Sequence, residues 1–327
     1  MAQECAKNHE IGRCIVLQRW LAIDIGGTKV AGALVHENGD VCCEHSEPTQ
    51  SAGNEQMAAQ LQRLARKVCE EAGISVESVS GVGVAVPGTV DRERGIARGG
   101  VNLGIDNLPV ADIFAELTSA PVALENDTNA GALGEKWFGA GRDIQDFAYM
   151  AVGTGVGGGL ILRGQLYVGA KGAAGEVGHT IVDPNGLRCK CGQIGCLEAM
   201  TSGVGMPQLA AKLLGEEKAR QLGRGELPSP PMIYAAAAAG DEGAARVAAE
   251  VGRLLAVSVV GLFRLLDVER VIVGGGVAGV GEPFLRAIYD GAAALGYNLK
   301  PEDVVLSPLG SKANLIGAAA VVREKSQ

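Results

Sequence analysis

Short apolar runs that stop at glycine turns open the patterned part of the chain. Residues 20–23 (WLAI) and 30–35 (VAGALV) flank the turn DIGGTK, and an Asn-Gly pair follows at 38–39. Apolar runs of this length, bounded by turn residues, are typical of strands, and Asn-Gly between such runs favours a type I′ hairpin turn. We therefore predict an antiparallel meander from Trp20. Its first turn offers glycine backbone N–H groups of the kind that cradle phosphate, at Gly26, Gly27 and Thr28, with Lys29 beside them.

One amphipathic helix and two further strands follow. The helix is predicted over 54–72, because apolar residues recur there at helical spacing and a glycine ends the run. Apolar runs at 79–88 and 121–127 predict strands, and the second ends at Asn126 and Asp127, directly before a helical pattern. Open α/β sheets bind ligands at the carboxyl ends of their strands. Asp is also a favourable helix N-cap, so both interpretations of Asp127 stay open at this point.

The strand, turn, strand plan recurs in the middle of the chain. FAYMAVGTGVGGGLIL, which begins at Phe147, repeats the pattern of LAIDIGGTKVAGALV: an apolar run, a Gly/Thr turn and a glycine-interrupted apolar run. Internal similarity of this kind indicates a duplicated structural unit. We predict two such units whose phosphate-binding turns face each other across a cleft. The second turn contains Gly153, Thr154 and Gly155.

The rest of the chain is mainly helical, with one further strand and glycine turn. Residues 206–266 are rich in alanine and are interrupted by a loop at 223–231. The longest apolar run, 254–263, is about half a membrane span, so it predicts a buried core helix. An apolar strand then leads into Gly274, Gly275 and Gly276, which suit either close approach of a phosphate chain or flat ligand, or a plain strand-to-helix turn. A last helix is predicted over 312–324.

Composition narrows the class of protein. A chain of 327 residues exceeds one comfortable core, so two domains with a ligand cleft between them are expected. The net charge is −8, from 29 basic and 37 acidic residues without a long run of either sign, which argues against nucleic acid and membrane surfaces as partners. Eight cysteines, five scattered and three clustered, and the lack of a leader-like segment predict reduced thiols and a cytoplasmic location. Residues 1–19 show no periodicity, and we attach no function to them.

A glycine-punctuated segment, 174–198, concentrates residues of the types that bind metals. Cys189, Cys191 and Cys196 form a CxCxxxxC set, with His179 upstream. Three thiolates and one imidazole complete a tetrahedral Zn²⁺ shell that leaves no position for water, which is the pattern of a structural site. The alternative is that these cysteines are ordinary small core residues. The residues between them are glycine and polar side chains, which are poor core material, so we favour zinc.

Together these motifs resemble the ROK family of sugar kinases and repressors, within the actin-like and hexokinase-like ATPase superfamily. The resemblance covers nearly all of residues 21–325. It runs in a fixed order through DIGGTK (24–29), PG (87–88), ENDTNAGALGE (125–135), VGTGVGGG (152–159), AGEVGH (174–179), CKCGQIGCLE (189–198) and VGGGV (273–277).

The resemblance implies an α/β fold of two ribonuclease-H-like (actin-like ATPase) domains, with a cleft that closes on ATP and a sugar. The small N-terminal domain would span 20–128 plus the C-terminal helix 311–325. The large domain, with the zinc loop, would span 129–310. The family commonly forms dimers or tetramers, so a homodimer or homotetramer is expected.

The resemblance also implies roles for individual residues. Asp127 would be the general base, and Asp24 would hold the Mg²⁺ that accompanies ATP, through water. His179 would serve twice, with one ring nitrogen on zinc and the other toward a hydroxyl. The sugar hydroxyls would be bound by Asn102, Asn126, Glu176, His179 and Glu198, and ATP by Asp24, Gly26, Gly27, Thr28, Lys29, Gly153, Thr154, Gly155, Gly274, Gly275 and Gly276.

The activity implied is ATP-dependent phosphorylation of a hexose at its 6-hydroxyl. Glucose is favoured, because the glutamates of EVGH and CLE resemble those of the glucokinase branch; mannose, fructose, allose and N-acetylmannosamine stay open. A sugar-responsive repressor of the same family is a second hypothesis, but it would need an N-terminal winged helix, and only residues 1–19 precede the first predicted strand. A third, an actin-like or chaperone-like ATPase, leaves Glu176, His179 and Glu198 beside a metal loop unexplained.

Overall fold

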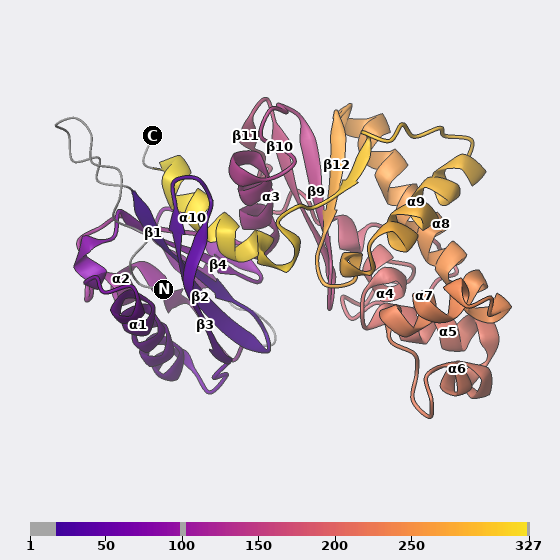
Figure 1. Ribbon diagram of the computed structural model, residues 1–327, viewed down its shortest axis with the longest axis horizontal. Helices are drawn as coiled ribbons and strands as arrows, with labels where there is room; N and C mark the ends of the chain where they lie inside the picture. Colours follow the sequence, from indigo (N-terminus) through magenta and orange to yellow (C-terminus); the bar gives the residue numbers. More distant parts are fainter. Residues whose placement is uncertain (1–17, 99–102, 326–327) are drawn as a thin grey trace.

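Two five-stranded sheets organise the protein, as a computed structural model of residues 18–98 and 103–325 shows (Figure 1). Asn102 lies outside these described residues. The strands of the first sheet are β1 (Arg19–Ile25), β2 (Lys29–His36), β3 (Val41–Pro48), β4 (Gly81–Val86) and β8 (Val122–Asn126). Those of the second are β9 (Phe147–Val152), β10 (Val156–Leu162), β11 (Gln165–Leu166), β12 (Arg270–Gly274) and β13 (Val304–Leu306). A small sheet contains β5 (Thr89–Asp91), β6 (Ile96–Arg98) and β7 (Leu108–Pro109).

The two large sheets repeat one topology. The strand orders are β3-β2-β1-β4-β8 and β11-β10-β9-β12-β13. In each sheet an antiparallel hairpin is followed by two strands that run parallel to the hairpin's first strand. The predicted repeat of a strand, turn and strand is therefore confirmed. Because the pairing is the same, the hairpin turns lie at equivalent ends of their sheets.

The predicted hairpin between β2 and β3 forms, but its turn type differs from the prediction. His36 N donates to Asp40 O at 2.9 Å, so three residues rather than two make the loop. Gly39 has φ 90°, whereas Asn38 is absent from the described residues with positive φ. A type I′ turn needs positive φ at both central positions, so that prediction is wrong.

The outer face of the first sheet is covered by α1 (Asn54–Glu71), and α2 (Val110–Ala115) packs near β8. The predicted amphipathic helix is confirmed, since its apolar positions Met57, Leu61, Leu64 and Val68 are fully buried. They share one core cluster with apolar residues of β1, β2 and β4. A short 3-10 helix, η1 (Val76–Ser78), leads from α1 toward β4.

Most of the helical mass lies beyond the second sheet (Figure 1). It consists of η2 (Val177–His179), α4 (Leu197–Thr201), α5 (Gly205–Leu214), α6 (Glu216–Leu222), α7 (Pro230–Ala238), α8 (Glu242–Leu266), η3 (Ala278–Val280) and α9 (Glu282–Ala294). The predicted core helix belongs to α8, where Leu254, Leu255 and Val259 have no exposed surface. Within the described part of the chain, no helix combines the length and apolar character needed to cross a membrane.

Two helices, α3 (Asp127–Phe138) and α10 (Ala313–Lys325), lie between the two large sheets; the 3-10 helix η4 (Gly310–Lys312) precedes α10. Side chains of both sheets, such as Trp20 and Tyr149, share one core cluster with them. The helices approach closely through glycine, because a Cβ on Gly317 would lie 2.0 Å from Ala130 O. The predicted small-residue face of the last helix is therefore confirmed. The division of the chain at residue 128 stays a prediction.

Candidate active site

Two carboxylates lie at the same edge of the first sheet. Asp24 is in β1, and Asp127 is the first residue of α3, directly after β8. Strand β4 runs parallel to both of these strands and lies between them. The carboxyl ends of the three strands therefore meet at one edge, where α/β sheets commonly bind ligands.

The start of α3 is capped by Asn126 and not by Asp127. Asn126 Oδ1 accepts hydrogen bonds from the backbone N–H groups of Thr128 (3.0 Å) and Asn129 (3.2 Å). Asp127 lies inside the first turn of the helix, and its Oδ1 accepts from Thr128 N at 2.9 Å. Since Asn126 provides the capping interaction, the N-cap interpretation of Asp127 is wrong.

The surroundings of Asp127 favour its protonated form. Burial raises the pKa of Asp127 above its ordinary value, and the charge of Glu176 raises it further. Hydrogen bonds from Thr128 and Asn126 partly offset this increase in pKa. Burial and the charge of Asp127 also raise the pKa of Asp24 to about 7, while Lys29 lowers it. Carboxyls with raised pKa values beside each other are typical of acid–base sites.

The predicted sugar-binding residues of the second half come from two short segments. Glu176 directly precedes η2, and His179 ends it. Glu198 is in α4, and its Oε2 accepts a hydrogen bond from Val156 N at 2.9 Å. Glu198 is therefore attached to the turn between β9 and β10. The negative charge of Glu176 raises the pKa of Asp127, so the two acids lie close enough to interact although they belong to different halves.

The first glycine turn has a more closed backbone than the sequence suggested. Gly26 N donates to Lys29 O at 2.8 Å, and Thr49 Oγ1 donates to Gly26 O at 2.6 Å. The Gly26 amide is thus used within the turn and is not bare, contrary to the prediction. Gly27, Thr28 and Lys29 are exposed, so the outer part of the turn remains open to a ligand.

The second and third glycine turns lie side by side. The point where a Cβ on Gly153 would lie is 3.9 Å from Gly276 N. Gly275 has φ 89°, and a Cβ there would lie 2.5 Å from Val152 O, whereas nothing lies within 4 Å of a Cβ on Gly276. A Cβ on Gly155 would lie 2.4 Å from Glu198 Oε2. Gly155 therefore makes room for Glu198, a constraint that the phosphate interpretation did not include.

The predicted metal ligands come together. One ligand atom from each of His179, Cys189, Cys191 and Cys196 can be chosen so that all lie within 4.8 Å of one another. Cys189 Sγ is 3.7 Å from His179 Nδ1, and Cys191 Sγ is 3.6 Å from Cys196 Sγ. Ligands about 2.0 to 2.3 Å from a tetrahedral Zn²⁺ have separations of this size. The set fits zinc by its chemistry, and it leaves His179 Nε2 available for another contact.

One ion pair at the site was not predicted from the sequence. Arg92, between β5 and β6, donates from Nε and Nη2 to the two carboxylate oxygens of Glu125, both at 2.5 Å. Glu125 directly precedes Asn126 and is only 3% exposed. The only available signal was a charged residue inside an otherwise apolar strand, because a buried carboxylate needs a partner.

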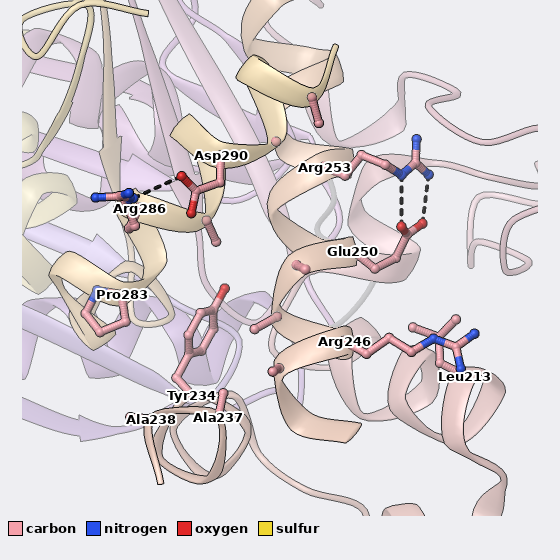
Figure 2. A pocket seen from close by; sticks show the side chains of 16 residues that line it. Leu213, Tyr234, Ala237, Ala238, Arg246, Glu250, Arg253, Pro283, Arg286 and Asp290 are labelled. Carbon is pink, nitrogen blue, oxygen red and sulfur yellow. Dashed lines mark hydrogen bonds and ion pairs between the residues drawn. The ribbon is translucent and has the colours of Figure 1, made fainter. Parts of the chain in front are cut away.

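A groove with a volume of about 890 Å³ lies elsewhere, between α7, α8 and α9 (Figure 2). Alanine side chains form much of its lining, and its charges occur partly as the pairs Arg253–Glu250 and Arg286–Asp290. None of the predicted site residues lines it. We therefore place the candidate active site at the strand ends, where acids and glycine turns converge, and not in this groove.

The duplicated sheets define a protein of the actin-like ATPase fold. Residues 20–325 match the ROK family, and the chain belongs to that family. The chain is 34% identical to a glucokinase of Thermotoga maritima over 93% of this chain and 97% of that protein. It is 32% identical to a xylose repressor of Caldicellulosiruptor bescii, over 92% of this chain and 77% of the repressor. A ROK family glucokinase from Streptomyces griseus, solved in complex with glucose and AMPPNP, is 32% identical, with a TM-score of 0.77 and coverage of 94% and 99%.

Proposed function

We propose that the protein phosphorylates a hexose at its 6-hydroxyl with ATP as the phosphoryl donor. The observation that carries the proposal is Asp127, a carboxylate of raised pKa at the start of α3, electrostatically coupled to Glu176 of the other half. Phosphoryl transfer to an alcohol needs one group to accept the hydroxyl proton, together with positioning and neutralisation of phosphate charge. Asp127 supplies that group, and the glycine turns supply backbone positions for phosphate.

ATP would bind with its phosphates at the glycine turns of the two sheets. The outer part of the first turn, Gly27 to Lys29, is exposed, and Gly276 leaves open space in the third. Asp24 would hold the Mg²⁺ of Mg-ATP through water, since its half-buried carboxyl lies at the end of β1. The ion neutralises phosphate charge during transfer. A bound cation would also favour the ionised form of Asp24, whose pKa is raised to about 7 in its absence.

The sugar would be held by Asn126, Glu176, His179 and Glu198, with Asn102 as a further ligand. Carboxylate and amide groups bind hydroxyls by paired hydrogen bonds, and a sugar of the wrong shape leaves such groups unpaired at a large cost in affinity. Glu198 already accepts a bond from Val156 N, so one of its oxygens is held in place. This anchoring would pre-orient Glu198 for a sugar hydroxyl.

His179, Cys189, Cys191 and Cys196 would hold a structural Zn²⁺. Four protein ligands leave no open position on the ion, so it would stabilise the loop and take no part in phosphoryl transfer. His179 Nδ1 faces Cys189 Sγ, which leaves Nε2 for the sugar. Metal binding and sugar binding would then share one side chain, and loss of zinc would weaken both the loop and the sugar site.

Glucose is the proposed substrate, supported by the similarity to two glucokinases over nearly the whole chain. The test is a panel of glucose, mannose, fructose, allose and N-acetylmannosamine in a coupled assay of ADP release, with product position determined by NMR. A highest kcat/KM for glucose, with 6-phosphate as product, is the expected result. A preference for another hexose would agree with the proposed kinase activity but would contradict glucose as the substrate.

The same assay tests the repressor hypothesis. That hypothesis needs a test because the chain is nearly as identical to a xylose repressor as to the glucokinase of Thermotoga maritima. A protein that binds sugar by calorimetry yet transfers phosphate to none of the panel would contradict the kinase proposal.

Sedimentation equilibrium would test the expected homodimer or homotetramer.

A further inference from the structure

The carboxylate of Glu125 accepts four hydrogen bonds, three at Oε1 and one at Oε2. It receives Arg92 Nε and Nη2 at 2.5 Å each, Asn126 N at 2.8 Å and Asn129 Nδ2 at 3.0 Å. Two of these donors belong to the segment that begins α3, on either side of Asp127. A buried carboxylate with a bidentate guanidinium partner is held far more rigidly than an exposed one. Glu125 therefore fixes the backbone from which Asp127 extends.

Arg92 provides the only positive charge in this network, and it comes from a separate element. It lies between β5 and β6, in the small sheet that is distinct from the two large ones. Its side chain is 33% exposed, whereas that of Glu125 is 4% exposed. The hairpin of β5 and β6 thus carries Arg92, the residue that compensates the charge of Glu125. Without Arg92, a nearly buried negative charge would remain unpaired.

The third nitrogen of Arg92 faces the other half of the molecule. Nη1 donates no hydrogen bond among the described residues, and it is 3.6 Å from the point where a Cβ on Gly172 would lie. Gly172 has φ 72° and belongs to the loop between β11 and η2, which leads to Glu176. The guanidinium therefore lies between the start of α3 and the loop that carries a proposed sugar ligand.

We propose that Arg92 is a positioning residue, which acts through Glu125 to hold Asn126 and Asp127 in place and which lies beside the loop at Gly172 on its other side. It touches neither the sugar nor ATP in this role. The inference rests on the proposed kinase function, because it assigns to Arg92 the alignment of the proposed general base. It adds a residue of the β5–β6 hairpin to the machinery of the site.

The first experiment compares Arg92→Ala with Arg94→Ala. Arg94 is an exposed arginine in the same turn, and its side chain donates no hydrogen bond to Glu125, so the control makes the same change in charge. Arg92→Ala should lower kcat by up to about 10²-fold, the size of effect that a misplacement of about 1 Å produces. The sugar dissociation constant, measured by calorimetry without ATP, should rise less than kcat falls, because Asn126 is one of several proposed sugar ligands and His179 and Glu198 lie on other segments. Arg94→Ala should keep both values.

The second experiment asks whether the guanidinium itself is required. Arg92→Lys keeps the charge but cannot make the bidentate contact, so it should recover little of the lost kcat. Added guanidinium ion should restore kcat in Arg92→Ala and leave Arg94→Ala unchanged. Both roles lower the thermal midpoint, because Glu125 loses its partner, but with a merely structural role the kcat of folded Arg92→Ala would not respond to guanidinium. That lack of response, or a kcat within twofold of wild type in Arg92→Ala, overturns the proposal.

A readout that needs no turnover separates this inference from the kinase proposal. Amide hydrogen exchange at residues 126–129 should be faster in Arg92→Ala than in wild type and in Arg94→Ala, because Asn126 N loses a fixed acceptor. If the wild-type protein phosphorylates no sugar, the proposed function fails while faster exchange still supports the positioning role. Equal exchange in all three proteins overturns the positioning role even if the protein is a kinase.

Discussion

The two large sheets have the same strand order but carry different chemistry at their ligand-facing ends. In the first, the central strand carries Asp24 just before its last paired residue; the equivalent residue of β9 is Ala151. The edge strand β8 of the first sheet is followed by Asp127, whereas the equivalent strand of the second sheet, β13, is followed by Ser307. The acids of these strand ends therefore lie on one sheet only.

This difference explains how one duplicated plan can serve two substrates. A triphosphate is strongly anionic, and a carboxylate pointing at it without a cation would repel it. The ends of β9 and β13 carry no acid of their own, and the carboxylate nearest to the second turn, Glu198, accepts a hydrogen bond from Val156 N, so this sheet repels a triphosphate less than the first. The acids of the first sheet are suited to a neutral sugar hydroxyl and to Mg²⁺. Duplication supplied the backbone turns twice, and the placement of charge made the two halves unequal.

The largest effect is expected from removing the acid of α3. Asp127→Asn keeps size and hydrogen bonding but cannot accept a proton, so kcat should fall by roughly 10²–10⁴-fold while sugar affinity changes far less. The pKa of Asp127 is raised, and the ionised form is the base, so wild-type kcat should also fall as pH drops through that raised value. A steady-state pH profile and calorimetry measure both. Near-normal turnover in the variant would contradict the role of Asp127 as general base and leave it a sugar-binding residue.

The next effect concerns the loop with the candidate metal ligands, a feature that the described residues show in the second half only. Cys191→Ala or chelation should lower the thermal midpoint by several degrees or more and weaken sugar binding with it, because we propose that His179 binds both the metal and the sugar. Calorimetry and elemental analysis check this. Cys43→Ala, a cysteine outside the cluster, is the control and should keep its metal. Active protein without stoichiometric zinc would contradict the metal assignment.

A smaller effect should follow from making the second sheet resemble the first. Ala151→Asp places a carboxylate at the position equivalent to Asp24, at the end of β9 beside the second glycine turn. Like-charge repulsion should raise KM for ATP by about tenfold or more, with little change in KM for sugar. Ala151→Asn has the same shape without the charge and should behave like wild type. Equal KM values for ATP in both variants would mean that phosphates lie away from this turn.

The smallest effect is a gain of stability. The pKa of Asp24 is raised from 3.8 to about 7 in the folded protein, so the cost of ionising it in the fold grows as pH rises between these values. Asp24→Asn removes that cost. Without ligands, the variant should gain roughly 1 kcal/mol over wild type at pH 8, since water screens the half-buried group, and almost nothing at pH 4. Urea unfolding at both pH values measures the gain; a gain independent of pH would contradict this assignment.

The features that followed from local pattern were predicted correctly. The helix over 54–72, the strand that ends at Asn126 and the repeat at Phe147 all depend on apolar periodicity and turn residues, which are properties of neighbouring residues. The metal cluster was also accessible, because three of its ligands lie within 189–196. Each of these signals is local in the chain.

The features that were missed depend on contacts between distant segments. The bond between Glu198 and Val156 joins segments of the second half through space, and it changes the reason why residue 155 must be glycine. The pair Arg92–Glu125 has no spacing that marks it. The turn at 37–40 failed for a different reason: Asn-Gly fits more than one loop length, and strand pairing decided between them.

The position of α10 has a consequence for the order in which the protein can fold during synthesis. This helix packs against β1 and β4, yet it is the last described element to be made. Domains generally fold as they leave the ribosome, but the face of the first sheet that includes Trp20 and Ala22 stays without this partner until the entire second half has been translated. The nascent first sheet must therefore remain open or be protected on that face, and truncation within α10 should impair the half that was synthesised first.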